Sequence, residues 1–117
     1  MQEAFEQTAL ALTAVITEPD LIQAQQAVDI SCSAPDHELL LVAWLNAIIF
    51  EMATRKMLFS RYEVSLQDCQ LTGRIWGEDI DIARHQPTVE IKGATYTELK
   101  VAQEADGNWL AQCIVDV

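Results

Sequence analysis

The feature that most constrains the fold is one long apolar stretch. Residues 39–53 read LLLVAWLNAIIFEMA, and 13 of these 15 positions are apolar, the exceptions being Asn46 and Glu51. A membrane-spanning helix needs about 20 such residues, so this stretch is too short to cross a bilayer. We therefore expect a helix inside a soluble domain, covered on most of its sides. Asp36 is a suitable N-cap for it, and Arg55-Lys56 suit its C-terminus.

The segments around this helix switch between helical and strand periodicity. Residues 2–17 carry one apolar face at helical spacing, made of Phe5, Ala9, Leu12 and Ile16. Alternation of apolar and polar residues predicts strands over residues 23–33, 57–66, 69–75, 89–103 and 109–117, with a polar loop over 77–88. We expect residues 1–117 to form one α+β domain, with two helices packed on a mostly antiparallel or mixed sheet. The last strand is apolar on both faces, which predicts a central position in that sheet.

The charge balance restricts the class of partner. Seven Lys and Arg stand against eighteen Asp and Glu, which gives a net charge of −11. Nucleic-acid binding draws on Lys and Arg, so direct binding of RNA or DNA is not expected. A basic protein partner or a metal cation suits the sign, and so does a role in solubility alone. Three of the seven basic residues, Arg84, Lys92 and Lys100, nevertheless lie together with His85 in the segment 84–101.

The cysteines and the first residues indicate a compartment. The chain has three cysteines, Cys32, Cys69 and Cys113, with no CxxC spacing, and each lies in an apolar or alternating run. This pattern predicts buried thiols in a reducing compartment. Residues 1–9 contain two Glu and no basic residue, so no signal peptide is expected there. We expect a soluble, cytosolic protein without a membrane partner.

The sequence holds no nucleophile elbow, phosphate-binding loop or HExxH motif, which argues against an independent enzyme. His37 lies in the first turn of a predicted helix, where a solvated or dipole-adjacent role accounts for it. The polar loop carries Glu78, Asp79 and Asp81, with His85 nearby. Carboxylates at this spacing suit a hard cation, and a solvated loop is the alternative.

Two further groups of charged residues are candidate sites. Asp116 precedes the terminal carboxylate of Val117, and two such carboxylates repel each other unless a cation or a basic side chain lies between them. A frayed, exposed terminus is the alternative. Glu90 and Lys92 share one face of a predicted strand. Lys92 is placed to reach Asp116 or a partner, and a solvated ion pair is the alternative.

Several motifs resemble the archease family. Residues 36–64, DHELLLVAWLNAIIFEMATRKMLFSRYEV, are similar to its central helix and following strand. Residues 77–101, GEDIDIARHQPTVEIKGATYTELKV, resemble its Gly-Glu, Asp, His and Glu-(Ile/Val)-Lys run. The ending WLAQCIVDV and the first helix EAFEQTALALTAVIT also fit. The resemblance therefore covers nearly the whole chain, in order.

The resemblance implies an accessory role without catalysis by this chain. Archeases assist the RtcB-type tRNA-splicing RNA ligase by promoting guanylylation of the ligase's active-site histidine, which sustains multiple turnover. The chemistry, GTP and divalent metal belong to the ligase. For this chain the resemblance implies a divalent cation, with calcium a candidate, at Asp116 and Val117, beside Lys92. Other matching residues are expected to support the surface presented to the ligase, namely Glu90, His85, Glu78 and Tyr96.

Two features depart from the family pattern. Family members usually begin with a strand carrying a His-Thr-Ala-Asp motif whose Asp is a metal ligand, and this sequence has no such strand. Its absence predicts an open sheet edge, which is a site for unwanted pairing. We therefore expect a shortened chain, a mis-assigned start, or a homodimer that covers the edge. Thr97 stands where the family usually has His, and a hydroxyl does not replace imidazole as a ligand or proton carrier.

Two other function classes compete with the accessory role. A metal-dependent hydrolase would use Glu78, Asp79, Asp81 and His85, and it would turn over substrate without a partner. A chaperone-like module would hold other proteins through its acidic face. Its binding would survive EDTA and the loss of Asp116.

Overall fold

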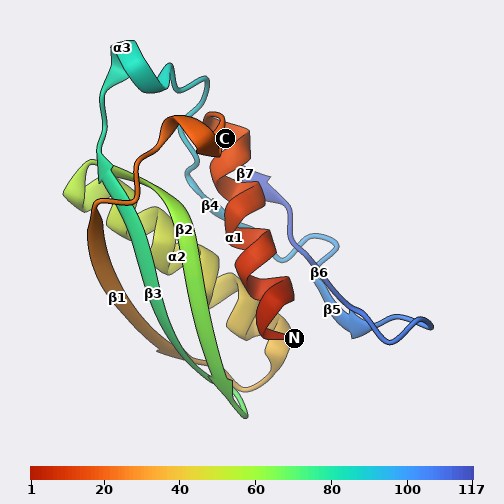
Figure 1. The fold of residues 1–117 in the computed structure, drawn as a ribbon. Coiled ribbons are helices and arrows are strands. Elements are labelled where there is room, and N and C mark those ends of the chain that lie inside the picture. The colour runs from red at the N-terminus through yellow and green to blue at the C-terminus, as the bar shows by residue number, and fades with distance from the viewer.

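A computed structural model describes residues 1–117 and shows an α+β fold (Figure 1). The helices are α1 (Gln2–Ile16), α2 (His37–Arg55) and the short α3 (Ile82–His85), with one 3-10 turn, η1 (Pro19–Leu21). The strands are β1 (Gln26–Ser33), β2 (Met57–Gln67), β3 (Gln70–Asp79), β4 (Gly93–Ala94), β5 (Lys100–Gln103), β6 (Trp109–Gln112) and β7 (Val115–Asp116). The radius of gyration of 13.7 Å is close to the value of about 13 Å for a compact 100-residue domain.

The main sheet is antiparallel, in the order β1-β3-β2. The hairpin β2–β3 supplies two of its strands, and its register shifts between Phe59 and Arg61. A bulge inserts one extra residue and so changes which face the following side chains reach. This explains why Phe59 and Tyr62, three residues apart, are both buried. The predicted α+β class with antiparallel pairing is confirmed.

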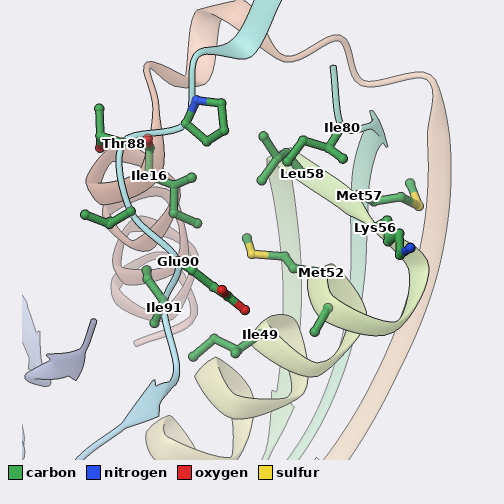
Figure 2. A pocket seen from close by; sticks show the side chains of 13 residues that line it. Ile16, Ile49, Met52, Lys56, Met57, Leu58, Ile80, Thr88, Glu90 and Ile91 are labelled. Atoms are coloured by element: carbon green, nitrogen blue, oxygen red, sulfur yellow. Dashed lines mark hydrogen bonds between the residues drawn. The ribbon is translucent and has the colours of Figure 1, made fainter. Parts of the chain in front are cut away.

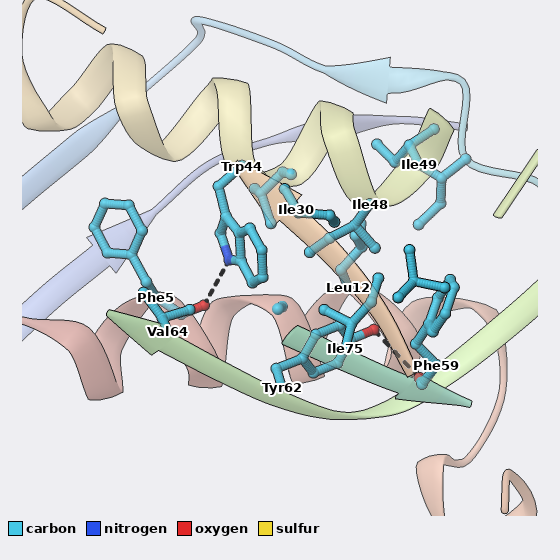
Figure 3. Close-up of a cluster of buried hydrophobic side chains, with 14 of the residues drawn as sticks. Phe5, Leu12, Ile30, Trp44, Ile48, Ile49, Phe59, Tyr62, Val64 and Ile75 are labelled. Carbon is cyan, nitrogen blue, oxygen red and sulfur yellow. Dashed lines mark hydrogen bonds between the residues drawn. The ribbon is translucent and has the colours of Figure 1, made fainter. Parts of the chain in front are cut away.

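The core fills the space between this sheet and the two long helices (Figure 3). Trp44 of α2 is fully buried and donates its indole N–H to the Phe5 carbonyl at 3.1 Å. Its ring meets the Tyr62 ring edge-on, with 6.2 Å between centroids. The predicted apolar face of α1, Phe5 through Ile16, lies in this core.

Helix α2 begins and ends as its sequence predicts. The Asp36 carboxylate accepts the Leu39 N–H at 2.8 Å, and Lys56 ends the helix in the left-handed conformation, with φ 53°. At 19 residues the helix is long and apolar enough to cross a membrane by length and composition, a test that a buried core helix also passes. The prediction that this stretch is too short to cross a bilayer considered only residues 39–53, whereas the helix extends from His37 to Arg55. In the fold it is a core helix, although Phe50 is 62% exposed.

Helix α1 covers the outer edge of β2 with polar side chains. Val64 N–H donates to the Glu6 carboxylate and Leu66 N–H to the Gln2 side-chain oxygen, each at 2.8 Å. At the other end of the helix, the Thr13 hydroxyl donates to the Phe59 carbonyl at 2.7 Å. An uncovered strand edge is a site for unwanted pairing. These side chains therefore remove an edge that would otherwise be open.

The last third of the chain differs from the predicted single sheet. The expected strand 89–103 is reduced to β4 and β5, and 109–117 to β6 and β7, which form two separate two-stranded ladders. The last strand is not central, because β6 pairs only with β5 and β7 only with β4. One reason is Asn46 of α2, whose side-chain oxygen accepts the Ala94 N–H at 2.9 Å and so covers the outer edge of β4.

Two smaller expectations need correction. The predicted polar loop 77–88 begins later, because Gly77–Asp79 continue β3 and pair with β2. Gly77 permits this pairing, since a Cβ there would lie 1.8 Å from the Leu58 carbonyl oxygen. The three cysteines are free and only half-buried, not fully buried as predicted. Partial burial nevertheless raises the pKa of the Cys32 and Cys113 thiols.

Candidate functional site

A buried carboxylate organises the loop after β3. Glu78 is 5% exposed and accepts hydrogen bonds on both oxygens. The Arg84 guanidinium binds it through both terminal nitrogens, and the Gln23 main-chain N–H donates to it at 2.5 Å. The Arg84 hydrogen bonds, followed by those from Gln23 and His85, hold the pKa of Glu78 down at about 2. Glu78 is therefore ionised and fully engaged within the protein.

His85 is completely buried and uses both ring nitrogens. Its Nδ1 accepts the Asp81 N–H at 2.9 Å, so the ring proton is on Nε2. Nε2 lies 3.1 Å from Glu78 and donates to that carboxylate. This arrangement is a neutral imidazole with no free nitrogen. The sequence predicted that His85 and Glu78 support a partner surface, and the structure places both side chains inside the protein, beneath the loop.

The same network ties the loop to the end of α1. The Thr17 hydroxyl donates to the His85 carbonyl, and Thr88 donates through its N–H to the Ile16 carbonyl at 2.8 Å. Sequence reasoning missed Arg84, Thr17 and Gln23 as partners. One signal was present for Arg84, because Asp81 stands three residues before it, and the Asp81 carboxylate caps α3 by accepting the Arg84 N–H at 3.2 Å. Glu78 and His85 thus hold residues 86–92 in place from inside the protein.

The Glu78 network makes stability depend on pH in the acid range. Its folded pKa of about 2 lies below the ordinary value of 4.5, so its contribution is complete above about pH 4.5 and is lost as pH falls towards 2. We expect Glu78→Gln to lower the free energy of unfolding by about 1–3 kcal/mol near pH 7 and by clearly less near pH 3. Urea unfolding followed by circular dichroism measures both values.

The matched control is Glu63→Gln. Glu63 is exposed and pairs with Arg61 at 2.9 Å, and exposed pairs contribute at most about 1 kcal/mol. A Glu78→Gln deficit that is equally large at both pH values would show that the lost contacts do not depend on the carboxylate charge.

Lys92 and Asp116 come together across the β4–β7 ladder. Gly93 pairs with Asp116, and the Lys92 N–H donates to the Asp116 carbonyl at 2.7 Å. Both side chains are exposed, and no ion pair joins them. The predicted proximity of Lys92 to Asp116 is therefore present in the backbone pairing. Val117 follows directly and is 57% exposed.

The ion pairs show how the basic residues of the segment 84–101 differ from one another. All four arginines bind carboxylates, whereas none of the three lysines, Lys56, Lys92 and Lys100, lies within 4.0 Å of one. Five acidic side chains take part in these pairs, so 13 of the 18 remain unpaired. Arg84 completes the loop network. Lys92 has no carboxylate partner within the protein.

Two more of the predicted surface residues are exposed. Tyr96 is 68% exposed in the segment between β4 and β5. Glu90 is exposed beside an apolar groove and is absent from every ion pair. Thr97 is also exposed, and its N–H lies 3.4 Å from the Thr95 hydroxyl. The accessible part of the predicted surface thus consists of Lys92, Glu90, Tyr96 and the end of β7.

The residues at the end of β7 supply only part of a cation site. Calcium takes six to eight oxygen ligands, usually from several carboxylates and carbonyls. No group of three His, Cys, Asp or Glu side chains lies close enough together to hold a metal ion. Asp116 and the main-chain oxygens of Val117 therefore do not complete a coordination shell by themselves.

The hydrolase constellation does not converge. Glu78 and His85 are engaged with each other, while Asp79 and Asp81 are exposed and Asp81 caps α3. A metal-activated water needs ligands with free lone pairs facing one point. The loop offers a structural cluster in place of such a site.

Comparison with known proteins gives one consistent result. The family model described as "Archease protein family (MTH1598/TM1083)" matches residues 1–117. A protein archease from Pyrococcus furiosus is 31% identical over 121 residues, which cover 100% of this chain and 85% of that protein. One from Methanopyrus kandleri is 33% identical, covering 99% and 85%. The solution structure of Methanobacterium thermoautotrophicum protein 1598 matches with a TM-score of 0.77 and 28% identity, covering 99% of this chain and 84% of that one.

Proposed function

Because the chain belongs to the archease family, we propose that it activates an RtcB-type tRNA-splicing RNA ligase by promoting the ligase's guanylylation and multiple turnover. Family membership supports an accessory role for the chain itself. The observation that supports the finer proposal is the pairing of β4 with β7, which brings the backbones of Lys92 and Asp116 together, with both residues exposed. Both residues are among those that match the family motif in this sequence.

The charges of this surface suit an accessory protein that works on a nucleotide-using partner. Lys92 has no carboxylate partner, and a free ammonium group binds phosphate oxygens well. The surrounding excess of carboxylates repels an RNA backbone. We infer that Lys92 approaches the phosphates of the ligase's nucleotide, while the acidic surface keeps RNA from competing.

A divalent cation, with calcium a candidate, is part of the same proposal. Asp116 and the main-chain oxygens of Val117 would hold it, and it would neutralise their charge when bound. Since these residues supply only part of a coordination shell, the remaining oxygens would come from water or from the ligase.

The first test is RNA ligation by the cognate RtcB-type ligase under multiple-turnover conditions. We expect substoichiometric amounts of this protein to raise the number of ligated products per ligase well above one, because an activator is released and reused. A parallel gel assay of labelled guanylate bound to the ligase reports the earlier step. A folded protein that changes neither quantity would refute the proposed function.

The same assay separates the accessory role from the acidic chaperone-like module. A chaperone-like module would bind the ligase or other proteins without changing guanylylation. Calcium titration and EDTA treatment in this assay also show whether a cation contributes to stimulation.

A further inference from the structure

An apolar groove opens between the C-terminal ends of the two long helices. It has a volume of about 450 Å³ and is bounded by α1, α2, the first residues of β2 and the segment 87–91 (Figure 2). Ile49, Met57 and Leu58 form its floor and belong to the buried core. The volume falls within the range of about 300–1,000 Å³ that is typical of binding clefts.

The rim of this groove is apolar and exposed, which is unusual for so charged a surface. Ile80 is 38% exposed and Val89 is 37% exposed, and both line the groove. Met52 is half-buried beside them. Exposed apolar side chains that surround a hollow mark a surface that another molecule can cover.

Two unpaired charges lie at different ends of the groove. Figure 2 shows the Glu90 side chain directed into the hollow near Met52 and Ile91, and Lys56 on the side of Met57. Neither charge takes part in an ion pair. A carboxylate that faces an apolar hollow without a counter-charge is complementary to a basic group on whatever enters.

We propose that this groove docks a segment of the protein partner that carries apolar side chains flanked by a basic residue. The apolar side chains cover Met52, Ile80 and Val89, and the basic residue pairs with Glu90. Charge complementarity selects this occupant, because 13 unpaired carboxylates give the protein a strongly anionic surface. Glu90 is two residues from Lys92, so the docked segment would continue onto the proposed activation surface. The inference rests on the proposed function for the identity of the partner, and not for the existence of the groove.

Ala53→Arg is the most direct test of the groove. Ala53 is exposed in the last turns of α2 and lines the hollow, and arginine is a good helix former. The new side chain fills the groove and offers Glu90 an internal partner. The matched control is Ala11→Arg, which places the same residue on the exposed face of α1 outside the groove. Glu90→Lys removes the complementary charge, and Glu104→Lys in the turn after β5 is its control.

The first readout is the affinity for the cognate ligase, measured by calorimetry. We expect Ala53→Arg and Glu90→Lys to weaken binding at least about tenfold, and the two controls to change it less than about twofold. Ligase that binds the groove variants as tightly as wild type would overturn the proposal while leaving the proposed function intact.

The second readout needs no ligase and separates the two proposals. A synthetic peptide of alternating leucine and lysine is titrated into the labelled protein, and amide shifts are followed by NMR. We expect shifts confined to residues 49–58, 80 and 87–91, which disappear in Ala53→Arg, and no such pattern with a serine–lysine peptide. This result supports the groove even if the ligase assay fails. Two results would overturn the proposal. One is that the leucine–lysine peptide shifts amide signals over the whole acidic surface. The other is that the amide signals of the groove shift only when a fatty acid is titrated in place of the peptide.

Discussion

Replacing Trp44 by alanine is expected to lower the free energy of unfolding by about 3–5 kcal/mol. The indole is completely buried, and its ring packs against Tyr62 and against the backbone of Gly73, where even an added Cβ would lie 2.7 Å from it. A domain of this size has a total stability of about 5–15 kcal/mol. The variant should therefore fold, but unfold at a much lower urea concentration.

Trp44→Phe separates the two parts of this loss. Phenylalanine keeps most of the apolar volume but leaves the buried Phe5 carbonyl without the indole N–H. An unsatisfied buried acceptor costs about 1–3 kcal/mol, so Trp44→Phe should lie between wild type and Trp44→Ala. Trp109→Ala is the control, because Trp109 is 38% exposed and its loss should cost below about 1 kcal/mol. Equal losses for Trp44→Ala and Trp109→Ala would contradict the assigned core.

The elements that could be predicted from the sequence are those whose pattern is set by local burial. The helical spacing of Phe5, Ala9, Leu12 and Ile16, the cap at Asp36 and the alternation around Val28 each correspond to an observed element. In these segments one face contacts the core throughout, so the period of apolar residues equals the period of the structure. The hairpin 57–75 was predictable for the same reason, apart from its bulge at Phe59.

The last third of the chain was less predictable because its hydrogen bonds depend on distant residues. Alternation over 89–103 predicted one strand, but Ala94 donates to Asn46, 48 residues away, and the strand is interrupted there. The strand pattern of 109–117 is apolar on both faces, yet Trp109 and Ile114 are exposed. Periodicity records which residues are apolar, and it does not record whether a neighbouring strand is present to cover them.

The candidate site was predicted in part for a similar reason. The motif placed Lys92 near Asp116, and the β4–β7 pairing does bring their backbones together. The motif also marked Glu78 and His85, but their burial depends on Arg84, Thr17 and Gln23, which no local pattern joins to them. A charged residue at the end of a strand is normally solvated. Only the fold shows that Glu78 is buried and fully hydrogen-bonded.

Lys92→Ala and Asp116→Ala are each expected to reduce the stimulation of multiple-turnover ligation at least about tenfold. The protein should stay folded in both cases. Both side chains are exposed and make no ion pair, so each loss should change the free energy of unfolding by no more than about 0.5 kcal/mol. The expected effect is therefore on the ligase and not on the fold. Lys100→Ala and Asp20→Ala are the matched controls, because both are exposed and lie outside the proposed surface.

The two variants should fail at different points if their proposed roles differ. Lys92→Ala should reduce ligase guanylylation at every calcium concentration, because no cation replaces a directed ammonium group. If a cation contributes, Asp116→Ala should behave like wild-type protein in EDTA, and excess calcium should restore stimulation by the wild-type protein but not by Asp116→Ala. Stimulation that is normal in both variants would show that the activation surface lies elsewhere. Stimulation that is lost in both, with guanylylation intact, would move the proposed action from nucleotide transfer to a later step of ligation.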